Sequence, residues 1–183
     1  MKKRGQIWVE TMLYTVIGLA LIGIVLAIVT PKINESKDRL AVEQAIESLG
    51  AFENRINTVL DFGGGNQRAI LEFTMKRGEL FIDVVDDKIS FVIDDLNKPY
   101  SEPGQTLTRG RIEILSEKKQ KTSNVSLTLD YSGIANLTYN DDNTILKKFS
   151  SASTPYSFRI RNLGRSDPSD FSELDRVNIV ETS

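Results

Sequence analysis

Glu10 is the residue of this chain whose position most clearly requires a partner of opposite charge. It stands directly before residues 11–30, twenty residues without a charged side chain, and it follows three cations, Lys2, Lys3 and Arg4. A helix of that length rises roughly 30 Å, about the thickness of the hydrocarbon core of a bilayer. A carboxylate that enters this core without a partner costs a few kcal/mol. We therefore expect Glu10 to need a positively charged group beside it.

Residues 11–30 can be compared with two common kinds of targeting segment. A secretory signal peptide usually has an apolar core of about 7–15 residues, followed by a small-x-small cleavage site. This stretch is longer, and no such site stands clearly at its end. A plain signal anchor accounts for the basic leader and the apolar stretch, since the leading cations hold the amino terminus in the cytoplasm. It leaves Glu10 unexplained.

The stretch "KKRGQIWVE" at residues 2–10, followed by an apolar helix, resembles the class III signal peptide of archaeal type IV pilin-like proteins. In that family a prepilin peptidase removes a short basic leader on the cytoplasmic side. The cut falls before a glutamine, and a glutamate is the fifth residue of the mature chain. The resemblance implies cleavage between Gly5 and Gln6, with Glu10 as the register residue of assembly. Between the glutamine and the glutamate the family often has a small hydroxyl residue, whereas this chain has Trp8.

The resemblance also implies a function and a location. Cleavage after Gly5 would remove the three cations and create an α-amino group that can offset Glu10 of a neighbouring chain. The chain is then a pilin or pseudopilin, and its partners are the prepilin peptidase, the membrane and other pilin subunits. The precursor lies in the membrane with its C-terminal part outside, and the mature chain joins a surface filament. The alternative is a single-pass surface protein that displays its domain without polymerising.

Other residues that could do chemistry are few. The chain has no cysteine and no histidine, which excludes disulfides, thiolate metal sites and Ser-His triads. Three acidic pairs remain as candidate calcium or catalytic carboxylates: Asp86/Asp87, Asp94/Asp95 and Asp141/Asp142. None has the D-x-D-x-D-G spacing of a calcium loop, so solvated turns are the expectation. We predict no catalytic residue, no metal and no cofactor; an enzyme that uses carboxylates is the third alternative.

Charge and sequons bear on possible partners. Three of the 23 basic residues and one of the 25 acidic residues precede Pro31, which leaves 20 basic and 24 acidic residues beyond it. This mild acidity argues against a nucleic-acid partner, which favours a basic face. If the domain lies outside the cell, three Asn-x-Ser/Thr sequons are candidate glycosylation sites. They are centred on Asn34, Asn124 and Asn136.

The apolar stretch and the residues after it predict one long helix over residues 6–62. Pro31 is expected to kink this helix or to begin a new one. Beyond it, apolar residues recur every three or four positions, which is typical of an amphipathic helix that docks on a sheet. This stripe consists of Ile33, Val42, Ala45, Ile46, Leu49, Phe52, Ile56, Val59 and Leu60. Asp38 and Glu43 are assigned to the polar face, and the glycine-rich residues 63–67 to a hinge.

From residue 68 to 183 the apolar period changes to two, which predicts a β domain; the resemblance implies that this domain is extracellular. Eight short runs are expected strands, with "KRGE" at residues 76–79 and Asp86–Asp87 as hairpin turns. The runs are AILEFTM, ELFIDVV, KISFVID, RIEIL, NVSLTLDY, IANLTY, YSFRIRN and RVNIV. The predicted fold is therefore α+β, a long N-terminal helix followed by an antiparallel sandwich or open barrel.

Overall fold

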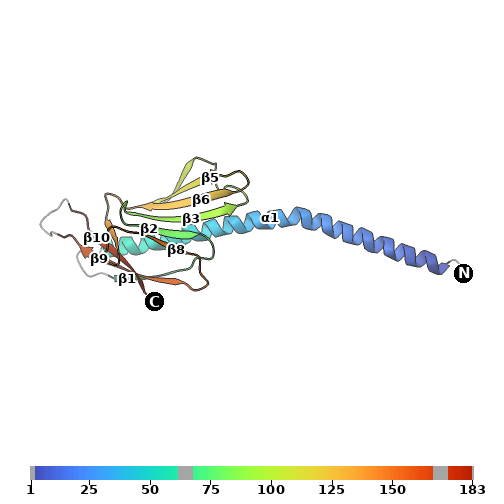
Figure 1. Ribbon diagram of the computed structural model, residues 1–183, viewed down its shortest axis with the longest axis horizontal. Coiled ribbons are helices and arrows are strands. Elements are labelled where there is room, and N and C mark those ends of the chain that lie inside the picture. The colour runs from blue at the N-terminus through green and yellow to red at the C-terminus, as the bar shows by residue number, and fades with distance from the viewer. Residues whose placement is uncertain (1–2, 62–67, 167–172, 183) are drawn as a thin grey trace. The chain divides into compact units, whose positions relative to one another are not determined.

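The protein is represented by a computed structural model that describes residues 3–61, 68–166 and 173–182 (Figure 1). Side chains are described for residues 8–61, 71–166 and 173–182. The chain divides into two compact units, Met1–Lys37 and Asp38–Ser183. The predicted leader ends inside the first unit, and the predicted hinge at residues 63–67 lies outside the described residues.

The helix α1, Lys3–Asp61, passes through Pro31 without a break, so Pro31 does not begin a new helix. Proline has no N–H to donate to the carbonyl four residues earlier, here that of Ala27. The hydroxyl groups of Thr15 and Thr30 donate to the carbonyls of Thr11 and Leu26, four residues earlier. These threonines therefore satisfy their polar groups within the helix, as an apolar environment requires.

Residues 38–61 of α1 belong to the second unit, and their apolar stripe is buried as the sequence predicts. The members with at most 6% exposed surface are Val42, Ala45, Ile46, Leu49, Phe52, Ile56 and Val59. Leu60 is half-buried, whereas Ile33, in the first unit, is 48% exposed. The predicted stripe is therefore correct from Val42 onward.

Among the described residues, ten strands follow the helix. They are β1 (Arg68–Phe73), β2 (Glu79–Asp83), β3 (Lys88–Leu96), β4 (Thr106–Arg109), β5 (Ile112–Lys118), β6 (Ser123–Asp130), β7 (Asn136–Tyr139), β8 (Leu146–Ser150), β9 (Tyr156–Gly164) and β10 (Arg176–Thr182). All eight predicted runs are strands, and β4 and β8 are additional. The predicted α+β class is confirmed.

The strands form two sheets. The larger has six strands in the order β4-β5-β6-β3-β2-β8, and all of its pairs are antiparallel. The smaller has the order β1-β9-β10-β7. Its last pair, β10 with β7, is parallel, which the sequence did not predict. Parallel strands need a long connection, and here residues 140–175, which include β8 and β9, lie between them in the chain.

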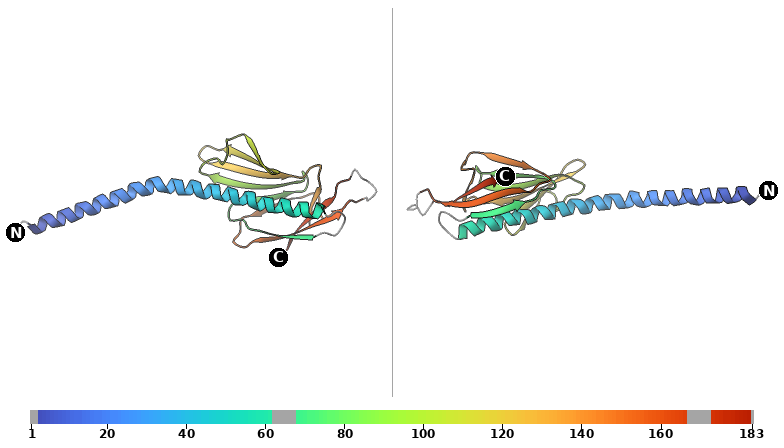
Figure 2. Two further views of the ribbon diagram at one scale, coloured as in Figure 1. Left: turned by 180° about the vertical axis from the view of Figure 1, so that it is seen from behind. Right: turned by 90° about the horizontal axis from the view of Figure 1, so that it is seen from below.

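The two sheets and residues 38–61 of α1 share one apolar core. Both views of Figure 2 show this part of the helix lying along the sheets. Aromatic rings join the layers: the Phe52 ring lies 5.2 Å from that of Phe73 on β1 and 5.3 Å from that of Phe158 on β9. Phe73 also lies 6.1 Å from Phe91 on β3. The helix is thus part of the core of the β domain.

The two predicted turns have different outcomes. Asp86 and Asp87 do close the β2–β3 hairpin, and Asp87 has a positive φ of 53°. The "KRGE" stretch is not a hairpin turn, because β1 and β2 lie in different sheets. Gly78 there has a φ of 95°, and a Cβ would lie 2.6 Å from the Phe91 ring and 2.7 Å from the Val92 carbonyl. Close approach to β3 therefore requires glycine at this position.

Candidate assembly segment

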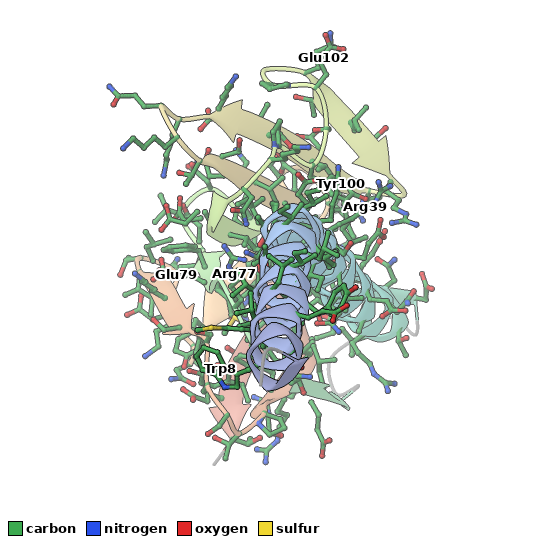
Figure 3. The ribbon with its side chains drawn as sticks, turned by 90° about the vertical axis from the view of Figure 1, so that its right-hand side faces the viewer. Trp8, Arg39, Arg77, Glu79, Tyr100 and Glu102 are labelled. Carbon is green, nitrogen blue, oxygen red and sulfur yellow. The ribbon has the colours of Figure 1, made fainter. Side chains whose placement is uncertain are left out.

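The apolar residues of the first unit form an uncovered helical surface. Every large apolar side chain from Trp8 to Val29 is at least 41% exposed, and Trp8 itself is 69% exposed (Figure 3). By length and composition, this helix is long and apolar enough to cross a membrane. Burial of apolar surface contributes roughly 25 cal/mol per Å². Lipid or other helices that cover this surface would therefore stabilise it.

The sequence-predicted processing and register residues all lie on α1. Gly5 and Gln6 are in the helical backbone, and their side chains lie outside the described residues. Glu10 is exposed on the helix. In the part of the chain that the structure describes, no ion pair or hydrogen bond involves its carboxylate. The residues beside it in the sequence, Val9 and Thr11, carry no charge and offer it no positive partner.

Asp38 is the polar centre that fixes the start of the second unit. Its carboxylate accepts hydrogen bonds from the Arg77 guanidinium, from the Asn97 backbone N–H at 2.7 Å and from the Asn97 side chain at 2.7 Å. Arg77, which is labelled in Figure 3, also donates to the carbonyls of Asp94 and Asp95. One carboxylate thus joins the helix to the loop before β2 and to the end of β3.

The sequence assignment of Asp38 to the polar face is wrong, because only 6% of its surface is exposed. It precedes the buried Val42 by four residues and Ala45 by seven, which places it on the apolar stripe. Burial by itself would raise the pKa of Asp38. The hydrogen bonds from Asn97 and Arg77 together outweigh burial, so the pKa lies below its ordinary value of 3.8.

Asp38→Asn should lower the free energy of unfolding by about 2–3 kcal/mol at neutral pH, because it removes charged hydrogen bonds from a buried site. A carboxyl group whose folded-state pKa is lowered stabilises the fold above its unfolded pKa. That contribution is lost as the pH falls through the folded value. The difference between wild type and variant should therefore shrink below about pH 3.8. This difference is measured by unfolding the full chain with urea in detergent and monitoring the transition by near-UV circular dichroism.

The matched control is Asp86→Asn, at an exposed aspartate of the β2–β3 turn. It should change the free energy of unfolding by less than about 0.5 kcal/mol. Equal losses for the two variants would show that the bonds to Arg77 and Asn97 add nothing specific.

A second polar cluster follows one turn later on α1. The Tyr100 hydroxyl donates to the Glu43 carboxylate at 2.7 Å, and Arg109 of β4 forms an ion pair with the same group. These two bonds hold the pKa of Glu43 below its ordinary value, and the bond from Tyr100 has the larger effect. Burial and then the Glu43 carboxylate raise the pKa of Tyr100. The loop at residues 97–105 is therefore tied to the helix.

The sequons differ in their surroundings. Asn34 is exposed on α1, whereas Asn124 on β6 and Asn136 on β7 are half-buried. The Asn124 side-chain amide donates to Glu117 at 3.3 Å. A glycan on Asn124 would have to displace this contact, so Asn34 is the most accessible of the three.

The acidic pairs are not brought together. Asp141 follows β7 with a positive φ of 66°, as expected of a turn, but Asp94 and Asp95 lie at a bulge within β3. Among the described residues, no group of three or more acidic side chains is placed to hold a metal ion. The described residues form an open groove of about 260 Å³ near Met75 and another of about 500 Å³ near Arg109, both beside α1.

The polar partners of the helix, Arg77, Asn97, Tyr100 and Arg109, were not identified from the sequence. The four-residue spacing from Asp38 to Val42 was the signal in the sequence that Asp38 lies on the buried stripe. A buried carboxylate needs a partner. Which residues supply that partner depends on tertiary contacts across more than thirty residues.

Comparisons with protein-family models, with curated proteins and with solved structures found no match to this chain.

Proposed function

We propose that this chain is a structural subunit, a pilin or pseudopilin, of an archaeal type IV pilus-like surface filament. The observation that carries the proposal is the uncovered apolar surface of residues 8–30, with Glu10 near its amino-terminal end. A helix that only anchors a domain needs no carboxylate there. A helix that packs among copies of itself can use that carboxylate to pair with a neighbour's amino terminus.

The precursor lies in the membrane with its amino terminus in the cytoplasm and its β domain outside. Prepilin peptidase cuts between Gly5 and Gln6 and removes Lys2, Lys3 and Arg4. The mature helix then loses the cations that held it at the cytoplasmic face, and it can leave the bilayer for the filament core. The β domain, whose polar clusters fix it to residues 38–61, faces the surroundings.

Mass spectrometry of the mature amino terminus tests this proposal. A chain that begins at Gln6 supports it, and Gly5→Leu should abolish this cut because a bulky side chain precedes the scissile bond. Gly50→Ala is the control, since a Cβ at Gly50 meets no atom within 4 Å. An intact Met1, or a cut beyond Thr30, would instead indicate a single-pass anchored protein or a secreted domain.

A further inference from the structure

The six-stranded sheet ends in two strands that each have one partner. Within the described residues β4 pairs only with β5, and β8 pairs only with β2. All four residues of β4 are exposed, and Leu107 among them is 47% exposed. On β8, Leu146 is 60% exposed. Free edges with exposed apolar residues are templates for pairing with another chain.

The directions of the strands define how two copies can join. Every neighbouring pair in the sheet is antiparallel and the number of strands is even, so β4 and β8 of one copy run in opposite directions. If a second copy in the same orientation continues the sheet, its β8 therefore lies antiparallel to β4. A contact between two different edges is heterologous, and such contacts repeat without limit unless they close a ring.

The two edges carry complementary charge. The groove of about 500 Å³ beside β4 is lined by Glu43, Glu47 and Glu53 of α1, together with Arg109. Arg109 already pairs with Glu43, whereas no ion pair involves Glu47 or Glu53 in the described part of the chain. The helix side of this groove therefore carries two carboxylates, Glu47 and Glu53, that lie outside any ion pair in the described residues.

The β8 edge carries two lysines: Lys148 forms an ion pair with Glu79, and Lys147 lies on the matching side of the sheet. Lys147 lies on the same side of the sheet as Phe149, which is buried in the core, whereas Lys148 lies on the other side. On β4, Leu107 and Arg109 share one side, and this side faces α1 because Arg109 pairs with Glu43. The Lys147 ammonium lies 5.5 Å from the Phe149 ring centroid, and no carboxylate pairs with it among the described residues. If two β8 strands paired with each other, their lysines would lie close together and repel. This repulsion favours β4 as the partner of β8.

We propose that β8 of one copy pairs antiparallel with β4 of a second copy, and that Lys147 enters the groove of Glu47 and Glu53. The sheet then continues from one copy to the next. This inference rests on the proposed function, because a filament supplies copies in one orientation. It adds a contact between β domains to the packing of the apolar helices.

Disulfide cross-linking tests this contact, because the chain contains no cysteine. Thr108→Cys is combined in turn with Leu146→Cys, Lys148→Cys or Ser150→Cys, which samples the register on the outer face of the sheet. Within one copy the two strands are five strand spacings apart, roughly 24 Å. A disulfide needs Cα atoms within about 7 Å, so any bond formed must join two copies.

Oxidation of the full chain in membranes or sheared surface preparations should give a ladder of multimers for at least one double variant. We expect at least tenfold more multimer than for each single-cysteine variant. The control pairs Ser126→Cys with Lys148→Cys, because Ser126 lies on the interior strand β6 and faces no edge. Near-UV circular dichroism confirms that each variant is folded.

Charge reversal gives an independent readout. Lys147→Glu should reduce the ladder, and adding Glu47→Lys to the same chain should restore it. If none of the three double variants forms a ladder while the chains begin at Gln6 and assemble, the edge contact is wrong and the proposed function stands. A ladder from chains that keep Met1 supports the edge contact and contradicts the proposed function.

Discussion

Phe52→Ala should lower the free energy of unfolding of the β domain by about 3–5 kcal/mol. Phe52 is fully buried between the rings of Phe73 and Phe158, whose centroids lie 5.2 Å and 5.3 Å away. Truncation leaves a cavity where the helix meets the smaller sheet, and surrounding side chains relax only partly. The difference in free energy is measured by unfolding the full chain with urea in detergent and monitoring the transition by near-UV circular dichroism.

The matched control for this prediction is Phe81→Ala. Phe81 is a half-buried phenylalanine on β2 that points away from the core, with the Lys148 ammonium 5.7 Å from its ring centroid. Its truncation should cost about 1 kcal/mol or less. A loss for Phe52→Ala no larger than that for Phe81→Ala would show that residues 38–61 of the helix are not part of the folded core.

Glu10→Ala should leave cleavage and membrane insertion intact but lower the yield of filaments in sheared preparations by about tenfold or more. The reason is the lost ion pair at the membrane boundary: a contact of about 1.4 kcal/mol already corresponds to a factor of ten. Glu10→Gln, which keeps the shape and removes the charge, should have the same defect. The yield is measured against the amount of processed subunit in the membrane.

Glu102→Ala is the control for Glu10→Ala, since Glu102 is an exposed glutamate in the loop before β4 (Figure 3). It should leave filament yield unchanged. Normal yield from Glu10→Ala would mean that Glu10 has no register role, even if the chain is processed at Gln6.

The helix and most strands could be predicted because their patterns are local. The stripe from Val42 to Val59 repeats at helical spacing, and all eight predicted runs with alternating apolar residues are strands. The strands β4 and β8 were missed because Thr106–Arg109 is exposed throughout and Leu146–Ser150 buries only Phe149. Edge strands have little apolar alternation, and only their neighbours make them strands.

What the sequence could not provide is the set of contacts between distant segments. Gly78 looks like a hairpin glycine, but its role is to let the chain pass close to Phe91 as it changes sheets. Asp38 was assigned to solvent because its partners, Arg77 and Asn97, come 39 and 59 residues later. The residues proposed for processing and assembly come from a local motif, so the sequence suffices to propose them.

The pairing of β1 with β9 has a consequence for the order in which the domain folds. Synthesis proceeds from the amino terminus, yet the partner of β1 begins more than eighty residues after β1 ends. The Phe52 ring, on the apolar stripe of residues 38–61, packs against Phe73 of β1 and Phe158 of β9, and the smaller sheet needs the carboxyl-terminal β10 to join β9 to β7. Contacts so distant in sequence slow folding. The packing around Phe52 is therefore completed only when nearly the whole chain has emerged, and a chain truncated before Arg176 lacks the buried Val177 and Ile179 of β10.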